Sequence, residues 1–165
     1  MSHRVIGIDP GTGIFGFGVI EIDQRRQLSL VDAGVIRTKA NQPLDERLVE
    51  IYRYLAGIIA KTKPHQMAIE KLFFAQNVTT AMSVSHARGV AMLTGKLAGL
   101  EVAEYTPLQI KQALTGYGRA DKNQMQQMVK VMLGLKTAPK PDDCADALAA
   151  AITHATSRPP IAPPA

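Results

Sequence analysis

Residues Val5 to Ile8 form a run of four apolar side chains that ends at Asp9, and Pro10 and Gly11 follow directly. A continuous apolar run of this kind is typical of a strand that is buried on both faces, as at the centre of a sheet. An Asp before Pro-Gly is often only a turn former. At the end of a buried strand, however, a carboxylate is costly to remove from water unless it is paired or bound to a metal. We therefore predict a central strand here and a functional role for Asp9.

The rest of the hydrophobic pattern predicts an α/β protein with a mixed sheet. The first three strands are joined by short connections and should form an antiparallel meander. After them, helical periodicity alternates with two short apolar strands, and further helices close the chain. The expected strands after the first span about 15–20, 28–38, 66–72 and 101–105, and the expected helices about 43–60, 79–100, 107–116, 121–133 and 142–155.

The length of 165 residues suits one domain. We expect a domain over residues 1–157 and, because residues 158–165 are rich in proline, a disordered tail after it. The formal net charge of +5 favours a polyanionic partner such as nucleic acid, since Lys and Arg release counterions from phosphates. The same charge would also suit a mildly basic soluble protein with no such partner.

Cys144 is the only cysteine in the chain, so an intrachain disulfide framework is impossible and a reducing compartment is favoured. The apolar run at Val5 to Ile8 is too short for the core of a signal peptide. No later segment has the run of about 18 uncharged apolar residues that a membrane span needs. We expect a soluble, cytoplasmic protein.

Three further acids accompany Asp9 as candidates for a metal site. Glu70 follows the apolar strand residues before it, whereas Asp143 and Asp146 lie three apart and so occupy neighbouring positions on one helix face. Clustered carboxylates bind Mg²⁺ or Mn²⁺, which prefer oxygen ligands. Two such ions about 4 Å apart can activate a water and stabilise the leaving oxygen of a phosphodiester.

Each of these acids also has a structural interpretation. Glu70 could pair with a neighbouring lysine. Asp143 and Asp146 lie off the expected apolar face of their helix and could simply serve its dipole in the first turn. The functional interpretation therefore depends on the four acids together. The expected apolar face of that helix consists of Ala145, Leu148, Ala149 and Ile152.

Four segments, in this order and at these separations, give the chain a specific resemblance to a known family. It resembles the RuvC family of bacterial Holliday-junction resolvases from about residue 4 to residue 154. Each segment alone would be a weak signal, whereas their combination is specific. The segments are residues 5–11 (VIGIDPG), 68–71 (AIEK), 87–90 (ARGV) and 143–149 (DCADALA).

The resemblance implies an RNase H-like fold, a five-stranded mixed sheet of three antiparallel strands and then parallel strands, flanked by helices. It places the family's catalytic and metal-binding acids at Asp9, Glu70, Asp143 and Asp146, with Mg²⁺ as the cofactor and Mn²⁺ as a possible substitute. It also implies a homodimer that makes paired, symmetry-related nicks in a four-way DNA junction during recombination and repair. The branch-migration proteins RuvA and RuvB are the implied partners.

The resemblance also suggests residues that contact DNA near the catalytic Glu. Phe73 matches an aromatic that is thought to insert against junction bases. Strand alternation would place Glu70, Leu72 and Phe74 on one face and Phe73 on the other. If the strand ends by Leu72, this argument lapses, and either Phe73 or Phe74 could be the exposed one.

Basic residues supply the other candidate DNA contacts. Lys111 and Lys122 match family residues close to the scissile phosphate, where ammonium groups offset charge in the transition state; each could also be an ordinary solvated lysine. Arg88 could contact DNA or brace the dimer, and Arg119 lies in a Gly-rich basic loop. Asp142 adds a carboxylate beside the catalytic pair, but the spacing to Asp146 favours Asp143 as the ligand.

Two other classes of protein share parts of this pattern. An actin-like ATPase or sugar-kinase-type phosphotransferase also has a Gly-x-Asp-x-Gly-like turn after its first strand, to which Gly7 to Gly13 fits loosely. Such proteins usually need two domains of this type, and this chain has room for one. A catalytically silent RNase H-like module that only binds branched DNA is the other alternative, and the presence of all four acids argues against it.

Overall fold

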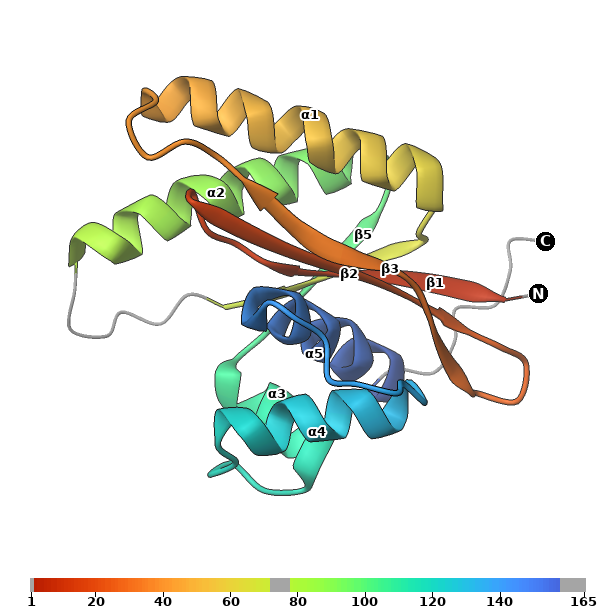
Figure 1. Cartoon of the computed structure of the whole chain (residues 1–165). Helices are drawn as coiled ribbons and strands as arrows, with labels where there is room; N and C mark the ends of the chain where they lie inside the picture. Colours follow the sequence, from red (N-terminus) through yellow and green to blue (C-terminus); the bar gives the residue numbers. More distant parts are fainter. Residues whose placement is uncertain (1, 72–77, 158–165) are drawn as a thin grey trace.

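Five strands form one mixed sheet with helices on both faces (Figure 1). The computed structural model describes residues 2–71 and 78–157. The strand order across the sheet is β3-β2-β1-β4-β5; the pairs β1–β2 and β2–β3 are antiparallel, whereas β1–β4 and β4–β5 are parallel. The predicted meander and the mixed sheet are thus confirmed. The strands are β1 (His3–Asp9), β2 (Ile14–Ile22), β3 (Leu28–Arg37), β4 (Gln66–Glu70) and β5 (Glu101–Tyr105).

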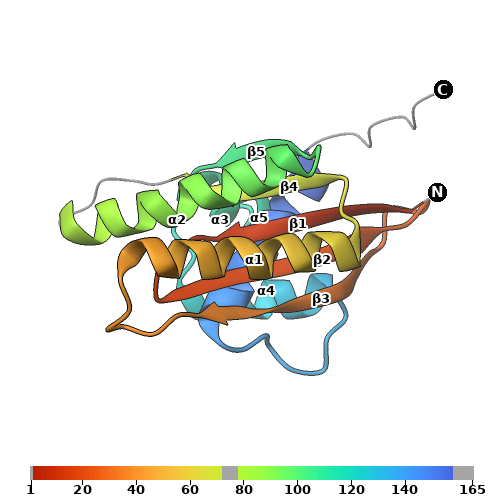
Figure 2. The ribbon, with the colours of Figure 1, turned by 90° about the horizontal axis from the view of Figure 1, so that it is seen from above.

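The helices divide unequally between the two faces. α1 (Leu44–Thr62) and α2 (Val78–Leu97) cover one face, and Figure 2 shows them side by side over the strands. α5 (Asp142–Ser157) covers the other face, and α3 (Pro107–Thr115) and α4 (Lys122–Met132) pack against its outer side (Figure 1). The sheet therefore separates two hydrophobic clusters, one on each face. Because side chains alternate along β1, this strand contributes to both clusters: Val5 packs toward α5, whereas Ile6 and Ile8 pack toward α1 and α2.

Local sequence signals explain the start of α4 and the end of α2. Asp121 and Gln124 form the predicted capping box at the start of α4. The end of α2 lies three residues before the predicted one. Gly99 adopts a φ of +79°, and the amide of Leu100 donates to the carbonyl of Gly95, which together form a Schellman ending. Of the described helices, none is both long and apolar enough to cross a membrane.

The burial of α5 differs from the sequence prediction. Almost every residue from Cys144 to Ala155 is buried, rather than only the face of Ala145, Leu148, Ala149 and Ile152. The cause is the second layer, because α3 and α4 cover the side of α5 that the sheet does not. Asp143 and Asp146 are consequently half-buried, and the prediction that they lie off the packed part of the helix is wrong.

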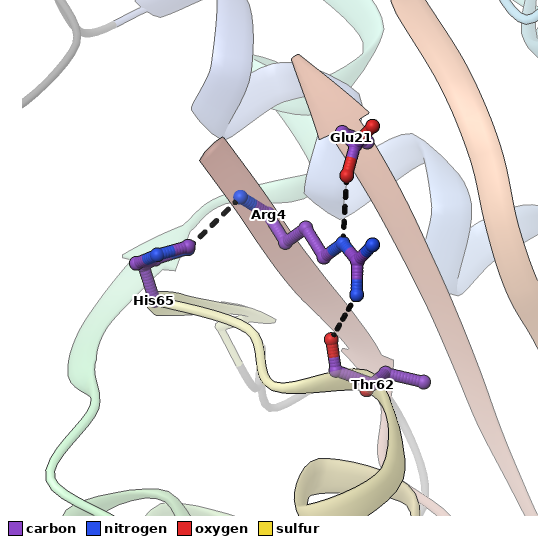
Figure 3. A network of polar contacts seen from close by, with 4 residues as sticks. All are labelled: Arg4, Glu21, Thr62 and His65. Carbon is purple, nitrogen blue, oxygen red and sulfur yellow. Dashed lines mark hydrogen bonds and ion pairs between the residues drawn. The ribbon is translucent and has the colours of Figure 1, made fainter. Parts of the chain in front are cut away.

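An arginine network fastens the end of the sheet that lies away from Asp9. Figure 3 shows Arg4 at its centre: Nε donates to Glu21 Oε2 at 2.8 Å, and a terminal guanidinium nitrogen donates to the carbonyl oxygen of Thr62 at 2.7 Å. The backbone amide of Arg4 donates to His65 Nδ1 at 3.1 Å. The network joins β1, β2 and the end of α1 at this end of the sheet.

Candidate active site

Asp9 and Glu70 lie side by side at one end of the sheet, where their strands finish. Each is the last residue of its strand, and the two strands are parallel neighbours in which Ile8 is paired with Ile69. Alternation turns Asp9 and Glu70 toward the face that α5 covers, the same face to which Val5 and Ala68 belong. The sheet alone therefore brings together two of the four predicted acids.

Glycines in β1 and β2 allow α5 to pack close enough to bring the other two acids to these strand ends. A Cβ atom on Gly16, which is paired with Asp9, would lie 2.2 Å from the carbonyl oxygen of Asp143. A Cβ atom on Gly7 would lie 1.9 Å from the carbonyl oxygen of Ala147. Only glycine fits where two backbones approach this closely. The first turn of α5 consequently rests on β1 and β2, which sets Asp143 and Asp146 beside the strand ends.

Sequence reasoning missed the role of these glycines. Gly16 and Gly18 alternate with Phe15 and Phe17, so one face of β2 is large and apolar while the other is bare. A Cβ atom on Gly18 would lie 2.5 Å from the side chain of Leu148, again on α5. A strand with glycine at alternate positions indicates a close backbone neighbour on that face. This signal was present in the sequence and indicates a close neighbour on that face, although it does not say which element that neighbour is.

The charges of the candidate acids raise one another's pKa values. Burial raises the pKa of Asp9 to about 7, and the charges of Asp146, Glu70 and Asp143 add to the increase, whereas Lys122 opposes it. Burial and then the charge of Asp146 raise the pKa of Glu70, against the opposing effect of Lys111. Burial also raises the pKa of Asp146. Repulsion of this kind among half-buried carboxylates is relieved when a cation binds between them.

The donor set fits a hard divalent cation. Over residues 2–71 and 78–157, the carboxylates of Asp9 and Glu70 form no hydrogen bond or ion pair, so their oxygens are available as ligands. Mg²⁺ and Mn²⁺ take such oxygens, with water completing the shell. In the same part of the chain, no three His, Cys, Asp or Glu side chains are gathered closely enough to hold one ion as they stand. Carboxylates that repel one another would have to draw together around the ion.

Two lysines flank the acids. Lys122 lies 3.0 Å from Asp142 Oδ2 and 3.7 Å from Asp146 Oδ2, measured from Nζ. Lys111, Lys122, Glu70 and Asp146 all line one pocket of about 260 Å³. Both predicted lysines are thus beside the acids and are not isolated on the surface. A larger hollow of about 820 Å³ lies over the first half of α1, away from these residues.

The neighbouring acids Asp142 and Asp143 face different partners. Asp142 is exposed, and its carboxylate accepts from Gln126 at 2.8 Å and pairs with Lys122, contacts that hold the pKa of Asp142 below its ordinary value. Asp143 instead contributes to the field at Asp9. The choice of Asp143 over Asp142 as the metal ligand stays a prediction, which the pairing of Asp142 with Lys122 favours.

Of the remaining candidates, Arg88 lies away from the acids. Arg88 pairs with Glu104 between α2 and β5, on the face opposite α5. Arg119 is exposed in the loop before α4. Phe73 and Phe74 fall outside the described residues. Because β4 ends at Glu70, the alternation argument for these two side chains does not apply.

Comparison with known proteins gives one consistent family. A family model described as "Crossover junction endodeoxyribonuclease RuvC" matches residues 5–154. The protein of that name from Desulfitobacterium hafniense is 55% identical over 153 residues, which cover 93% of this chain and 92% of the relative. The one from Chloroflexus aurantiacus is 51% identical over 158 residues, or 96% of each chain.

Solved structures agree with the sequence relatives. Thermus thermophilus RuvC in complex with a Holliday junction substrate superposes with a TM-score of 0.89 at 37% identity, covering 94% of both chains. The yeast mitochondrial Holliday junction resolvase Ydc2 shares the fold, with a TM-score of 0.64 at 16% identity over 93% of this chain and 79% of its own. The fold is RNase H-like, as the resemblance implied.

Proposed function

The chain belongs to the RuvC family of crossover junction endodeoxyribonucleases, and from this we propose that Asp9, Glu70, Asp143 and Asp146 are its catalytic, metal-binding residues. The protein is a nuclease that resolves Holliday junctions in DNA recombination and repair. The observation that supports these four residues is their convergence. The ends of β1 and β4 and the first turn of α5 meet on one face of the sheet, where burial raises the pKa of three of them.

The mechanism follows from the chemistry of these side chains. The reaction depends on a divalent metal, and we propose Mg²⁺, with Mn²⁺ able to replace it. A bound ion supplies an activated water and stabilisation of the leaving oxygen. Asp9 has to lose its proton before it can act as a ligand. Lys111 and Lys122 lie in the same pocket as Glu70 and Asp146, where their ammonium groups would offset charge that develops on the phosphate.

The assembly and the location are parts of the same proposal. α2 exposes an apolar stripe, because Val78, Met82, Leu93 and Leu97 are 58% to 70% exposed and their spacing places them on one side of the helix. A second copy of the chain would cover this stripe and give the paired nicks of a homodimer. The family resemblance supports RuvA and RuvB as partners and Phe73, Phe74 and Arg88 as DNA contacts. Arg119 is proposed as a further DNA contact because it lies in a basic loop, and a cytoplasmic location is proposed from the single cysteine.

The decisive experiment offers the purified protein a four-way junction, a linear duplex and a single strand, each with Mg²⁺ or with a chelator. Nicking is expected only with the junction and the metal. The Asp9→Asn variant should lose nicking and keep junction binding, because DNA affinity comes mainly from basic side chains.

Asp45→Asn is the matched control, since Asp45 is an exposed acid at the start of α1. It removes the same charge and should leave nicking unchanged. Junction binding without any Mg²⁺- or Mn²⁺-dependent nicking by the unaltered protein would contradict the enzyme assignment. Loss of binding in Asp9→Asn would show instead that Asp9 supports the fold.

A further inference from the structure

The loop between β1 and β2, residues 10–13, is held by hydroxyl groups from two other parts of the chain. The hydroxyl of Thr12, a residue only 7% exposed, hydrogen-bonds to the hydroxyl of Ser83 in α2. The carbonyl oxygen of Thr12 accepts from the hydroxyl of Thr38, just after β3. The backbone amide of Thr38 donates to the carbonyl oxygen of Gly13 at 3.1 Å.

Arg47 completes this network from α1. Its Nε donates to the hydroxyl oxygen of Thr38 at 2.8 Å. A threonine hydroxyl has one hydrogen to donate, and Thr38 gives it to the loop, so Arg47 uses the accepting side of the same oxygen. The loop is thereby joined to the end of β3, to α1 and to α2. We call Thr12, Thr38, Arg47 and Ser83 the loop clamp.

The loop clamp acts on the segment that begins at Asp9. The loop consists of Pro10, Gly11, Thr12 and Gly13, so Thr12 has its only side chain able to form a hydrogen bond. Glycines give a loop conformational freedom that has to be removed by contacts elsewhere. Asp9 is the residue before this loop, and a carboxylate that binds a metal needs a defined direction.

We propose that Thr12 is a positioning residue for the nuclease reaction, which fixes the direction of the Asp9 carboxylate through its hydrogen bonds to Ser83 and Thr38. This inference deepens the proposed function and rests on it. It also links Asp9 to α2, the helix that carries the exposed apolar stripe. Thr12 itself faces α2 and does not touch the reacting groups.

Two substitutions separate the hydroxyl from the shape of the side chain. Thr12→Val keeps the shape and removes the hydroxyl, whereas Thr12→Ser keeps the hydroxyl. The measurements are the single-turnover nicking rate with enzyme in excess, junction affinity in chelator, Mn²⁺ affinity by electron paramagnetic resonance, and the melting temperature. Thr12→Val should lower the nicking rate and the Mn²⁺ affinity about tenfold, since small misplacements of a catalytic group are costly. Junction affinity should stay within about twofold, and Thr12→Ser should restore most of the rate.

Substitutions on α2 test whether the bond to Ser83 is the one that matters. Ser83→Ala should also slow nicking, and adding it to Thr12→Val should slow nicking no further, because both remove the same bond. Ser85→Ala is the matched control, since the hydroxyl of Ser85 donates to the carbonyl of Ala81 within α2. It should leave the rate unchanged.

The outcomes are distinct. An unchanged rate in Thr12→Val, a Thr12→Ser variant as slow as Thr12→Val, or a rate that falls only in step with the folded fraction would each overturn the positioning role. An unaltered protein that does not nick junctions would overturn the proposed function instead. In that case the Mn²⁺ affinities decide: equal values in the unaltered protein and Thr12→Val overturn the positioning role, and a weaker value in Thr12→Val supports it.

Discussion

Burial and the charges of neighbouring acids both act on the carboxyl group of Asp9, and through its pKa they affect the stability of the fold. The pKa of Asp9 is raised to about 7, first by burial and then by the neighbouring acids. A folded-state pKa above the unfolded value means that the protonated form supports the fold. This support is complete below the unfolded pKa and is lost as the pH rises through about 7. Without metal, Asp9 therefore destabilises the protein at alkaline pH.

Removal of this charge should stabilise the metal-free protein. At pH 8 in chelator, Asp9→Asn is expected to raise the melting temperature by about 3–6 °C, and at pH 4 by much less, since Asp9 is then protonated. Differential scanning calorimetry across this pH range measures the effect. Asp45→Asn, on the exposed start of α1, should show no such pH dependence. Equal melting temperatures for Asp9→Asn and the unaltered protein at pH 8 would mean that Asp9 is not strained by burial.

At this scale the sequence alone argues more strongly for some residues than for others. A role for Asp9 followed from its place after a buried apolar run, because a buried charge needs a partner. Asp143 and Asp146 would pass for surface acids of a first helical turn without the family resemblance. The loop clamp could not be foreseen, since Thr12, Thr38 and Ser83 are distant in sequence and ordinary in type.

At the scale of helices and strands, the candidate site depends on the close packing of α5 against the face of β2 that carries Gly16 and Gly18, here called the glycine face. Gly16→Ala should push α5 away, because the new Cβ would overlap the backbone of Asp143 and neither strand nor helix can yield cheaply. The expected loss is about 2–3 kcal/mol in urea unfolding, together with loss of nicking. Gly57→Ala in α1 is the control: a Cβ there meets nothing within 4 Å, so it should stabilise the protein by about 0.5–1 kcal/mol. Full nicking by Gly16→Ala would show that α5 need not lie so close.

The Arg4 network at the other end of the sheet should affect stability without affecting nicking. The hydrogen bond from Arg4 is the main cause that lowers the pKa of Glu21, so the contribution of this pair is present above the unfolded pKa of Glu21 and is lost as the pH falls through the folded value. Arg4→Gln should lower the free energy of unfolding by about 1 kcal/mol at pH 7, a modest value because both side chains are partly exposed. The loss should be smaller in acid, where Glu21 is protonated.

Urea unfolding at the two pH values measures this difference. Arg25→Gln, in the exposed turn after β2, is the matched control and should leave the stability unchanged. A loss of stability in Arg4→Gln that is equal at pH 7 and in acid would exclude the ion pair as its cause. A fall in nicking by folded Arg4→Gln would show that the two ends of the sheet are coupled.

Element types and order were predictable because hydrophobic periodicity is local. The meander, the last strand and the capping box of α4 all appear as expected. The all-round burial of α5 was not predictable, since it depends on whether α3 and α4 form a second layer, and periodicity along one helix cannot report that. The glycine face of β2 was readable but needed knowledge of its neighbour.

At the scale of the whole molecule, metal binding should add to folding stability. A ligand that binds only the folded state stabilises it, by about 1.4 kcal/mol at roughly ten times its dissociation constant. Mg²⁺ should therefore raise the melting temperature by a few degrees at pH 8, and a chelator should reverse this increase. At pH 6 the increase should be smaller, because protons compete with Mg²⁺ for Asp9.

Thermal scans with and without Mg²⁺ at the two pH values test this expectation. In Asp9→Asn the effect of Mg²⁺ should be absent at both values, whereas Asp45→Asn should respond like the unaltered protein. Equal effects of Mg²⁺ at pH 6 and pH 8 would show that Asp9 does not take part in binding the ion.

The position of α5 has a consequence for how the protein is made. Its residues, 142–157, are the last that the structure describes, yet they supply Asp143 and Asp146 and cover one whole face of the sheet. A nascent chain that has emerged from the ribosome only as far as α4 carries Asp9 and Glu70 but has neither the other acids nor the packing that aligns them. On the proposed assignment of the four acids, nicking therefore requires α5 to be made and packed on the sheet. A chain truncated before α5 is expected to lack nicking activity even where it still binds DNA.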